Sequence, residues 1–163
     1  MMQQRGAVTV DLGRSHGLGG ILGREHDRLR SLYDDLCSAI GDHEREESAY
    51  LWSGLEAGLE ALFVFEERHL IPELDRVDLL EGAALRREHD EVRALLGEIG
   101  DGIISGRCRS TLVADLGARV EHHRDRKAAG LYSFVADRWA DPDNIGLRRS
   151  MNHALCRLLD GGT

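Results

Sequence analysis

The stretch REHDRLR at residues 24–30 recurs as REHDEVR at residues 87–93, with five of seven positions identical. One further position exchanges Leu29 for Val92, a conservative change. Each copy places a histidine, His26 or His89, among charged residues typical of an amphipathic helix. The repeat predicts that the chain has two similar halves, each with one Arg-Glu-His-Asp turn at an equivalent place.

Apolar residues on either side of these two copies recur in alternating steps of three and four residues. This spacing is typical of helices that face the core of a bundle. The four seams are Leu22-His26-Leu29-Tyr33-Leu36-Ile40, Trp52-Leu55-Leu59-Leu62-Glu66, Leu85-His89-Val92-Leu96-Ile99-Ile103 and Val113-Leu116-Val120-His123-Lys127-Gly130-Phe134. Every seam contains ionisable side chains where packing alone favours leucine.

Short connections between these stretches predict antiparallel neighbours. We therefore expect an all-α fold, an up-down antiparallel four-helix bundle with an additional short C-terminal helix. The expected organisation is a flexible N-terminal segment at residues 1–17, the bundle at 18–140, and a C-terminal helix and tail at 141–163.

The overall composition restricts the classes of partner. A formal net charge of −8 disfavours nucleic acid and anionic membranes. No apolar run approaches the roughly 20 residues of a membrane span, and residues 1–17 lack the apolar stretch of a signal peptide. Three cysteines at unrelated spacings are expected to be reduced thiols. We expect a soluble, cytoplasmic protein.

The ionisable seam residues are predicted to meet at one end of the bundle. Counting along an up-down bundle brings His26, Glu66 and His89 to one level, and His123 joins them if the fourth helix loosens at Ala129-Gly130. His26 and His89 should face each other across one cavity. Imidazoles with a carboxylate inside a helical bundle are typical ligands of non-haem iron.

The neighbouring Glu25 and Glu88 lie off the apolar seams. We therefore expect both of these side chains to turn away from the cavity.

The ordered set of Glu-His, FEERHLIP, Glu-His and EHHRDRKAAGLY resembles the hemerythrin-like family, the HHE cation-binding domains, over about Leu18 to Trp139. The resemblance implies an up-down four-helix bundle that encloses two non-haem irons. Family members bind dioxygen, handle nitric oxide or peroxide, or sense iron and oxygen.

The resemblance carries ligand roles to four positions and fails at two. The matching metal ligands are His26, Glu66, His89 and His123. Leu62 replaces the expected second-helix histidine, and Lys127 replaces a bridging carboxylate. An ammonium group adds positive charge and offers no ligand atom. Lys127 has an alternative role, an ion pair with Glu66 across the core.

Two further histidines are rival ligands. His69 follows Glu66 by three residues, a spacing used in carboxylate-bridged di-iron bundles, and His122 competes with His123. The remaining histidines, in a terminus, a loop and the tail, are expected to be exposed: His16, His43 and His153.

Three functions fit these observations. The first is a non-haem iron protein that senses or scavenges dioxygen, nitric oxide or peroxide. Its site is partial and holds either one ion or two. The second is a metal-free bundle that acts as a protein-interaction or regulatory module, with homodimer or protein-partner contacts through the C-terminal helix. The third is a metalloenzyme acting on peroxide or nitric oxide, although no substrate pocket is recognisable in the sequence.

Overall fold

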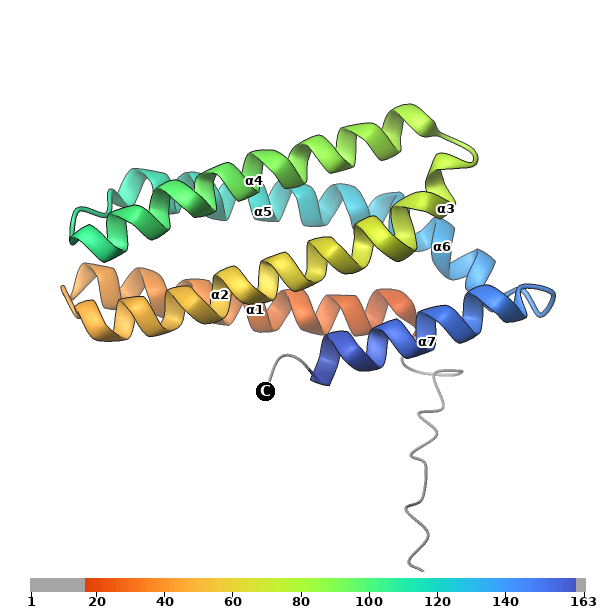
Figure 1. Cartoon of the computed structure of the whole chain (residues 1–163), viewed down its shortest axis with the longest axis horizontal. Coiled ribbons are helices and arrows are strands. Elements are labelled where there is room, and N and C mark those ends of the chain that lie inside the picture. Colours follow the sequence, from red (N-terminus) through yellow and green to blue (C-terminus); the bar gives the residue numbers. More distant parts are fainter. Residues whose placement is uncertain (1–16, 161–163) are drawn as a thin grey trace, which may run out of the picture.

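The computed structural model describes residues 17–160, and over this range the chain is helical without a strand (Figure 1). The elements are α1 (Leu18–Gly41), α2 (Arg45–Phe65), the π-helical turn η1 (Glu66–Leu70), α3 (Ile71–Asp75), α4 (Leu79–Ser105), α5 (Ser110–Ala129), α6 (Leu131–Ala140) and α7 (Ile145–Asp160). The predicted all-α class is confirmed. The first sixteen residues lie outside the described range, so flexibility of the N-terminal segment stays a prediction.

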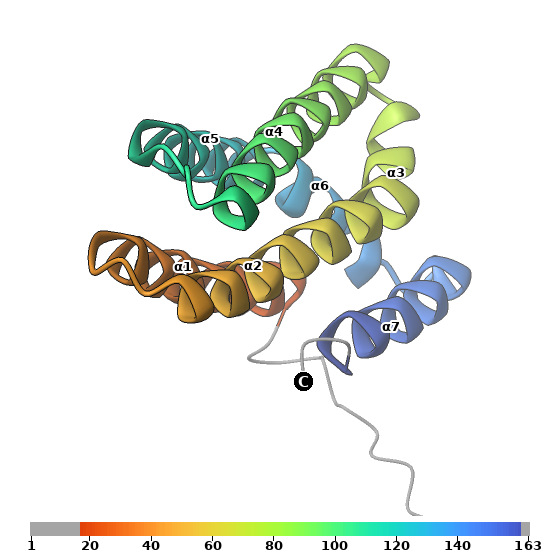
Figure 2. The same cartoon turned by 60° about the vertical axis from the view of Figure 1, so that its left-hand side comes forward.

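Four long helices form the bundle. Helix α1 packs against α2 and α5, and α4 packs against the same two helices, so each long helix has two neighbours. Figure 1 shows them side by side along the long axis, and Figure 2 shows the pairs α1–α2 and α4–α5 as two facing layers. Loops of a few residues join them, which makes successive helices antiparallel. The predicted up-down bundle is confirmed.

The second long helix is interrupted by a π turn, in which the amide of Ile71 donates to the carbonyl of Glu66. A π turn inserts one extra residue into the helix, and such turns are frequent at functional sites. The inserted residue lets two adjacent side chains, Phe65 and Glu66, both point inward. Pro72 follows in α3 and has no N–H to donate to the preceding turn.

The fourth long helix breaks at Gly130, which meets the condition under which His123 was expected to join the other site residues. The φ and ψ of Gly130 are −119° and −79°, far from helical values, and they separate α5 from α6. The break moves the buried seam along by one residue. Leu131, Tyr132 and Val135 are buried, whereas Phe134 is only partly buried. The predicted continuation of this seam through Gly130 and Phe134 is therefore wrong.

Helix α7 lies across the outside of the bundle (Figure 1) and contacts α2, η1 and α6. Its buried side chains are Met151, Ala154, Leu155 and Leu158. None of the helices at residues 17–160 is long and apolar enough to cross a membrane. Within that range all three cysteines are free thiols.

A glycine allows the close approach of α1 and α2. A Cβ built on Gly58 would lie 2.4 Å from Cδ2 of Leu29, which is buried, and 3.0 Å from the guanidinium of Arg28. The side chain of Leu29 therefore packs directly on the backbone of α2 at this point, and a larger residue at position 58 has to displace this core leucine.

Gly58→Ala is expected to lower the free energy of unfolding by about 1–2 kcal/mol, because the steric conflict with Leu29 outweighs the higher helix propensity of alanine. The matched control is Gly97→Ala in α4, where an added Cβ meets nothing within 4 Å. That change should raise stability by about 0.5–1 kcal/mol. Urea unfolding of both variants measures the difference, and equal effects would contradict the close contact.

Candidate metal centre

Three potential ligands from three elements meet in the bundle interior. Glu66 comes from η1, His89 from α4 and His123 from α5, and all three side chains are buried. One ligand atom of each lies within 4.8 Å of the others. The sequence predicted these three residues to share one level, and the structure brings them together.

The Glu66 carboxylate is fully buried and is surrounded by partners. Lys127 Nζ lies 2.7 and 2.9 Å from its two oxygens, and the Tyr132 hydroxyl donates to Oε1. His89 Nε2 lies 3.0 Å from Oε2. The expected ion pair between Glu66 and Lys127 is present, between two side chains with no exposed area.

Burial and pairing act in opposite directions on this carboxylate. Burial raises the pKa of Glu66, but the charge of Lys127 and the contacts with His89 outweigh it and hold the pKa well below its ordinary value of 4.5. Burial lowers the pKa of Lys127, and Glu66 opposes that shift. The carboxylate is therefore ionised at neutral pH, and it depends on its donors.

A carboxylate lies behind each of the two central histidines. His89 Nδ1 is 2.7 Å from Glu67 Oε1, and His123 Nδ1 is 2.5 Å from Glu88 Oε2. A carboxylate on the outer nitrogen of a histidine fixes the ring and turns the other nitrogen inward, which is the usual support of a metal-bound imidazole. Glu88 lies outside the central group, as expected, but it contacts the outer edge of His123, which the sequence did not predict.

Arginines hold these two carboxylates in place. Glu67 accepts from Arg93 at 2.8 Å, and Glu88 accepts from Arg126. Burial raises the pKa of Glu67, yet the hydrogen bonds from Arg93 and His89 bring it below its ordinary value. The role of Glu67 was not predicted from the sequence, where its only signal was its place next to Glu66.

The inward nitrogen of His123 has no hydrogen-bond partner. Burial, followed by the charge of Lys127, lowers the pKa of His123 to about 2, so this ring is neutral. Its Nδ1 proton points at Glu88, and Nε2 is therefore a lone pair that is buried without a partner, 4.0 Å from Glu66 Oε2. His89 differs, because its Nε2 lies 3.0 Å from Glu66 Oε2 and its Nδ1 lies 2.7 Å from Glu67 Oε1, so both of its ring nitrogens have a carboxylate partner.

The unpartnered Nε2 of His123 thus converges with a ring nitrogen of His89 and an oxygen of Glu66, and a cation suits these three ligand atoms. Phe63 closes one side of this group by stacking on His89, with ring centroids 4.2 Å apart. The residues present therefore fit a single ion bound by two nitrogens and one carboxylate.

His26 lies beside this group and not within it. Its Nε2 is 3.0 Å from the hydroxyl of Tyr132, which in turn donates to Glu66. Burial and the charge of Lys127 lower the pKa of His26 to about 4. The ring is buried on the inward face of α1, as expected, but Tyr132 stands between it and the carboxylate.

Tyr132 was missed because the predicted seam ran past Gly130 without a break. The internal repeat contained a signal for it, because Tyr132 follows Lys127 by five residues as the buried Ile71 follows Glu66.

The rival histidines do not reach the centre. His69 is half-buried against Phe65, with ring centroids 5.5 Å apart, on the side of η1 that faces α7. His122 is exposed on α5. Leu62 is buried at the position where the family has a histidine, and it offers no ligand atom. His43 and His153 are exposed as expected, and His16 lies outside the described residues.

Residues 20–135 match the Hemerythrin HHE cation binding domain family, which is most of the chain and includes all four helices of the bundle. The chain therefore belongs to the hemerythrin HHE cation-binding family. No curated protein and no solved structure gives a significant match.

Replacing the buried ion pair one residue at a time tests its strength. Lys127→Met leaves Glu66 without its cation and should lower the free energy of unfolding by about 3–5 kcal/mol in the presence of a chelator. Adding Glu66→Gln should recover much of this loss, with a coupling energy on the order of 2 kcal/mol.

The exposed pair Arg119–Glu91, with a separation of 2.8 Å, is the matched control for this cycle. The cycle of Arg119→Met and Glu91→Gln should give a coupling of about 0.2–1 kcal/mol. Both cycles are measured by urea unfolding at pH 7. A coupling for the buried pair as small as that of the exposed pair would contradict the contacts of Glu66.

Proposed function

We propose that this protein binds one divalent metal ion, iron by preference, through Glu66, His89 and His123. The observation that carries the proposal is the buried Nε2 of His123, which has no hydrogen-bond partner and converges with a ring nitrogen of His89 and a carboxylate oxygen of Glu66, while a second carboxylate lies behind each imidazole. Two imidazoles and one carboxylate suit non-haem iron, although zinc and copper also bind such sites strongly.

A single ion is favoured over two by what occupies the other side of Glu66. Lys127 and Tyr132 both contact Oε1, and Tyr132 also engages His26. The ammonium group stands where the family has a bridging carboxylate, and Leu62 supplies no second-helix ligand. A second cation would meet positive charge and too few ligands.

Sensing or scavenging of dioxygen, nitric oxide or peroxide is the function we propose for this site. An iron ion with an open coordination position supplies binding of such small ligands. The chain supplies two proton-bearing groups next to the carboxylate, Lys127 Nζ and Tyr132 Oη, and an aromatic wall formed by Phe63. Lys127 has a third N–H beyond its two contacts with Glu66 and can donate it to an anionic ligand, whereas the proton of Tyr132 is already donated to Glu66. Phe63 limits access of water.

A metal-free regulatory module is the second candidate function, and one observation favours it. The Lys127 ammonium already lies within hydrogen-bonding distance of both oxygens of Glu66. In this case the ion pair fills the centre permanently, and a surface of α7 would bind a protein partner or a second copy of the chain. Metal content distinguishes the two functions.

Protein incubated anaerobically with ferrous iron and then desalted should retain about one iron per chain, measured by mass spectrometry of the metal. His123→Ala should abolish stoichiometric retention, whereas the adjacent His122→Ala should not. Likewise, His89→Ala should abolish stoichiometric retention of iron, whereas His69→Ala should not. His26→Ala should retain the ion, since Tyr132 separates it from the site.

Loss of the outer carboxylate in Glu88→Gln should weaken iron binding by about 10- to 100-fold, because it no longer fixes the ring of His123. Absence of iron from the parent chain, or equal retention in His122→Ala and His123→Ala, would refute the proposed site and favour the metal-free function.

Restoring the two missing ligands should add a second ion. The double variant Leu62→His with Lys127→Glu is expected to retain about two irons per chain. Lys127→Glu alone places a second carboxylate beside Glu66 and should destabilise the metal-free fold by a few kcal/mol, on the order of a broken buried pair. Added ferrous iron should then stabilise this variant more than the parent. Thermal unfolding with and without iron measures this, and an unchanged iron count in the double variant would contradict it.

A further inference from the structure

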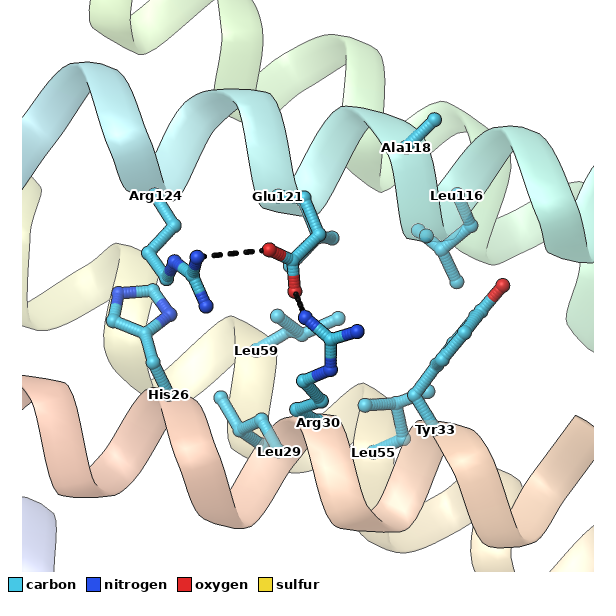
Figure 3. Close-up of a pocket in the computed structure, with 12 residues that line it drawn as sticks. His26, Leu29, Arg30, Tyr33, Leu55, Leu59, Leu116, Ala118, Glu121 and Arg124 are labelled. Atoms are coloured by element: carbon cyan, nitrogen blue, oxygen red, sulfur yellow. Dashed lines mark hydrogen bonds and ion pairs between the residues drawn. The ribbon is translucent and has the colours of Figure 1, made fainter.

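A cavity lies beside the metal centre, between α1 and α5, with α2 as its floor (Figure 3). Its volume is about 190 Å³. The walls are mainly apolar and come from Leu29, Leu55, Leu59, Leu116 and Val120. Figure 3 shows His26 at one end of the cavity and Tyr33 at the other, two helical turns apart on α1.

A glycine shapes the end of the cavity near Tyr33. The Tyr33 hydroxyl donates to the carbonyl of Val113 at 3.0 Å. It crosses α5 at Gly117, where an added Cβ would lie 2.4 Å from the hydroxyl oxygen. The ring of Tyr33 is thus held as a fixed end wall, and its hydroxyl is already used.

His26 presents a hydrogen-bond acceptor to this cavity. Tyr132 has one hydroxyl proton and donates it to Glu66, so its oxygen accepts from Nε2 of His26. In a neutral ring Nδ1 is then a lone pair. Nδ1 has no hydrogen-bond partner among residues 17–160, and in Figure 3 the ring borders the cavity.

The charged residues at the mouth are already neutralised. Arg30 and Arg124 lie 2.7 and 3.0 Å from the two oxygens of Glu121, which bridges them (Figure 3). Asp125 makes a further contact of 3.0 Å with Arg124. Two carboxylates thus balance the charges of the two arginines, and the mouth favours an uncharged occupant.

We propose that this cavity is a binding site for a small neutral hydroxyl compound of the size of phenol. An apolar cavity of about 150 Å³ accommodates benzene, so the present volume takes one aromatic ring with a substituent. The apolar body lies among the leucines, and the hydroxyl donates to Nδ1 of His26. A neutral ligand with an apolar body and one hydrogen-bond donor at one end matches the apolar walls, the acceptor of His26 and the paired charges at the mouth.

A chain of hydrogen bonds would link a ligand in this cavity to the buried carboxylate of Glu66. The ligand hydroxyl donates to His26, His26 donates to Tyr132, and Tyr132 donates to Glu66. The cavity itself needs no metal, so the site goes beyond the proposed metal function and is tested independently of it.

The test is titration calorimetry of the chelator-treated full chain with phenol, anisole and benzoate. Phenol should bind about fivefold or more tightly than anisole, whose methylated oxygen cannot donate. In His26→Leu the two should bind within about twofold of each other, since only the acceptor is lost. Benzoate should bind at least about tenfold more weakly than phenol, because carboxylates already balance the arginine charges at the mouth.

Matched variants of α5 locate the site. Val120→Phe fills the cavity and should weaken phenol binding by about tenfold or more. Ala114→Phe places the same ring on an exposed part of α5 outside the cavity and should leave binding unchanged.

Three results would overturn the proposal. They are no heat of binding for phenol up to millimolar concentration, equal binding of phenol and anisole by the parent chain, and tighter binding of benzoate than phenol. If Val120→Phe does not fold, the comparison of the three ligands on the parent chain still decides.

Discussion

The buried carboxylate of Glu66 is the constraint on which the centre depends. An ionised carboxylate in a helical core costs several kcal/mol unless charges and hydrogen bonds surround it. Its partners come from α4, α5 and α6, in the side chains of His89, Lys127 and Tyr132. One charge in η1 therefore fixes the relative positions of three other segments. It also explains why the apolar seams contain ionisable residues, and not leucine, at the positions that contact Glu66.

The helical pattern in the sequence was sufficient to predict the bundle and most of this centre. Side chains at steps of three and four share one face of a helix, so ionisable residues in those steps have to point into the core. This reasoning brought Glu66, His89 and His123 together and paired Glu66 with Lys127, and the structure agrees. It needs only regular helix up to each of these residues, which α2, α4 and α5 provide.

Prediction from regular helical spacing failed where the backbone is irregular. The π turn at Glu66–Leu70 and the break at Gly130 each change the phase of the helix that follows. A strict helical count therefore predicted Phe134 where the structure buries Tyr132. The outer carboxylates Glu67 and Glu88 were missed for another reason. They lie off the seam, and only the crossing of neighbouring helices brings them to the histidines.

The two irregularities stand at equivalent points of the internal repeat, because Gly130 follows Lys127 by three residues and His69, three residues after Glu66, lies within the π turn Glu66–Leu70. Each half thus bends where its inward ligand position ends, but the halves now carry opposite charges there. A pair of equal carboxylates attracts two cations, whereas a carboxylate and an ammonium neutralise each other. On the side of Glu66 that faces His89 and His123, the Nε2 of His123 is still without a partner. The repeat therefore preserves the shape of a symmetric centre while its charges restrict any metal to one side.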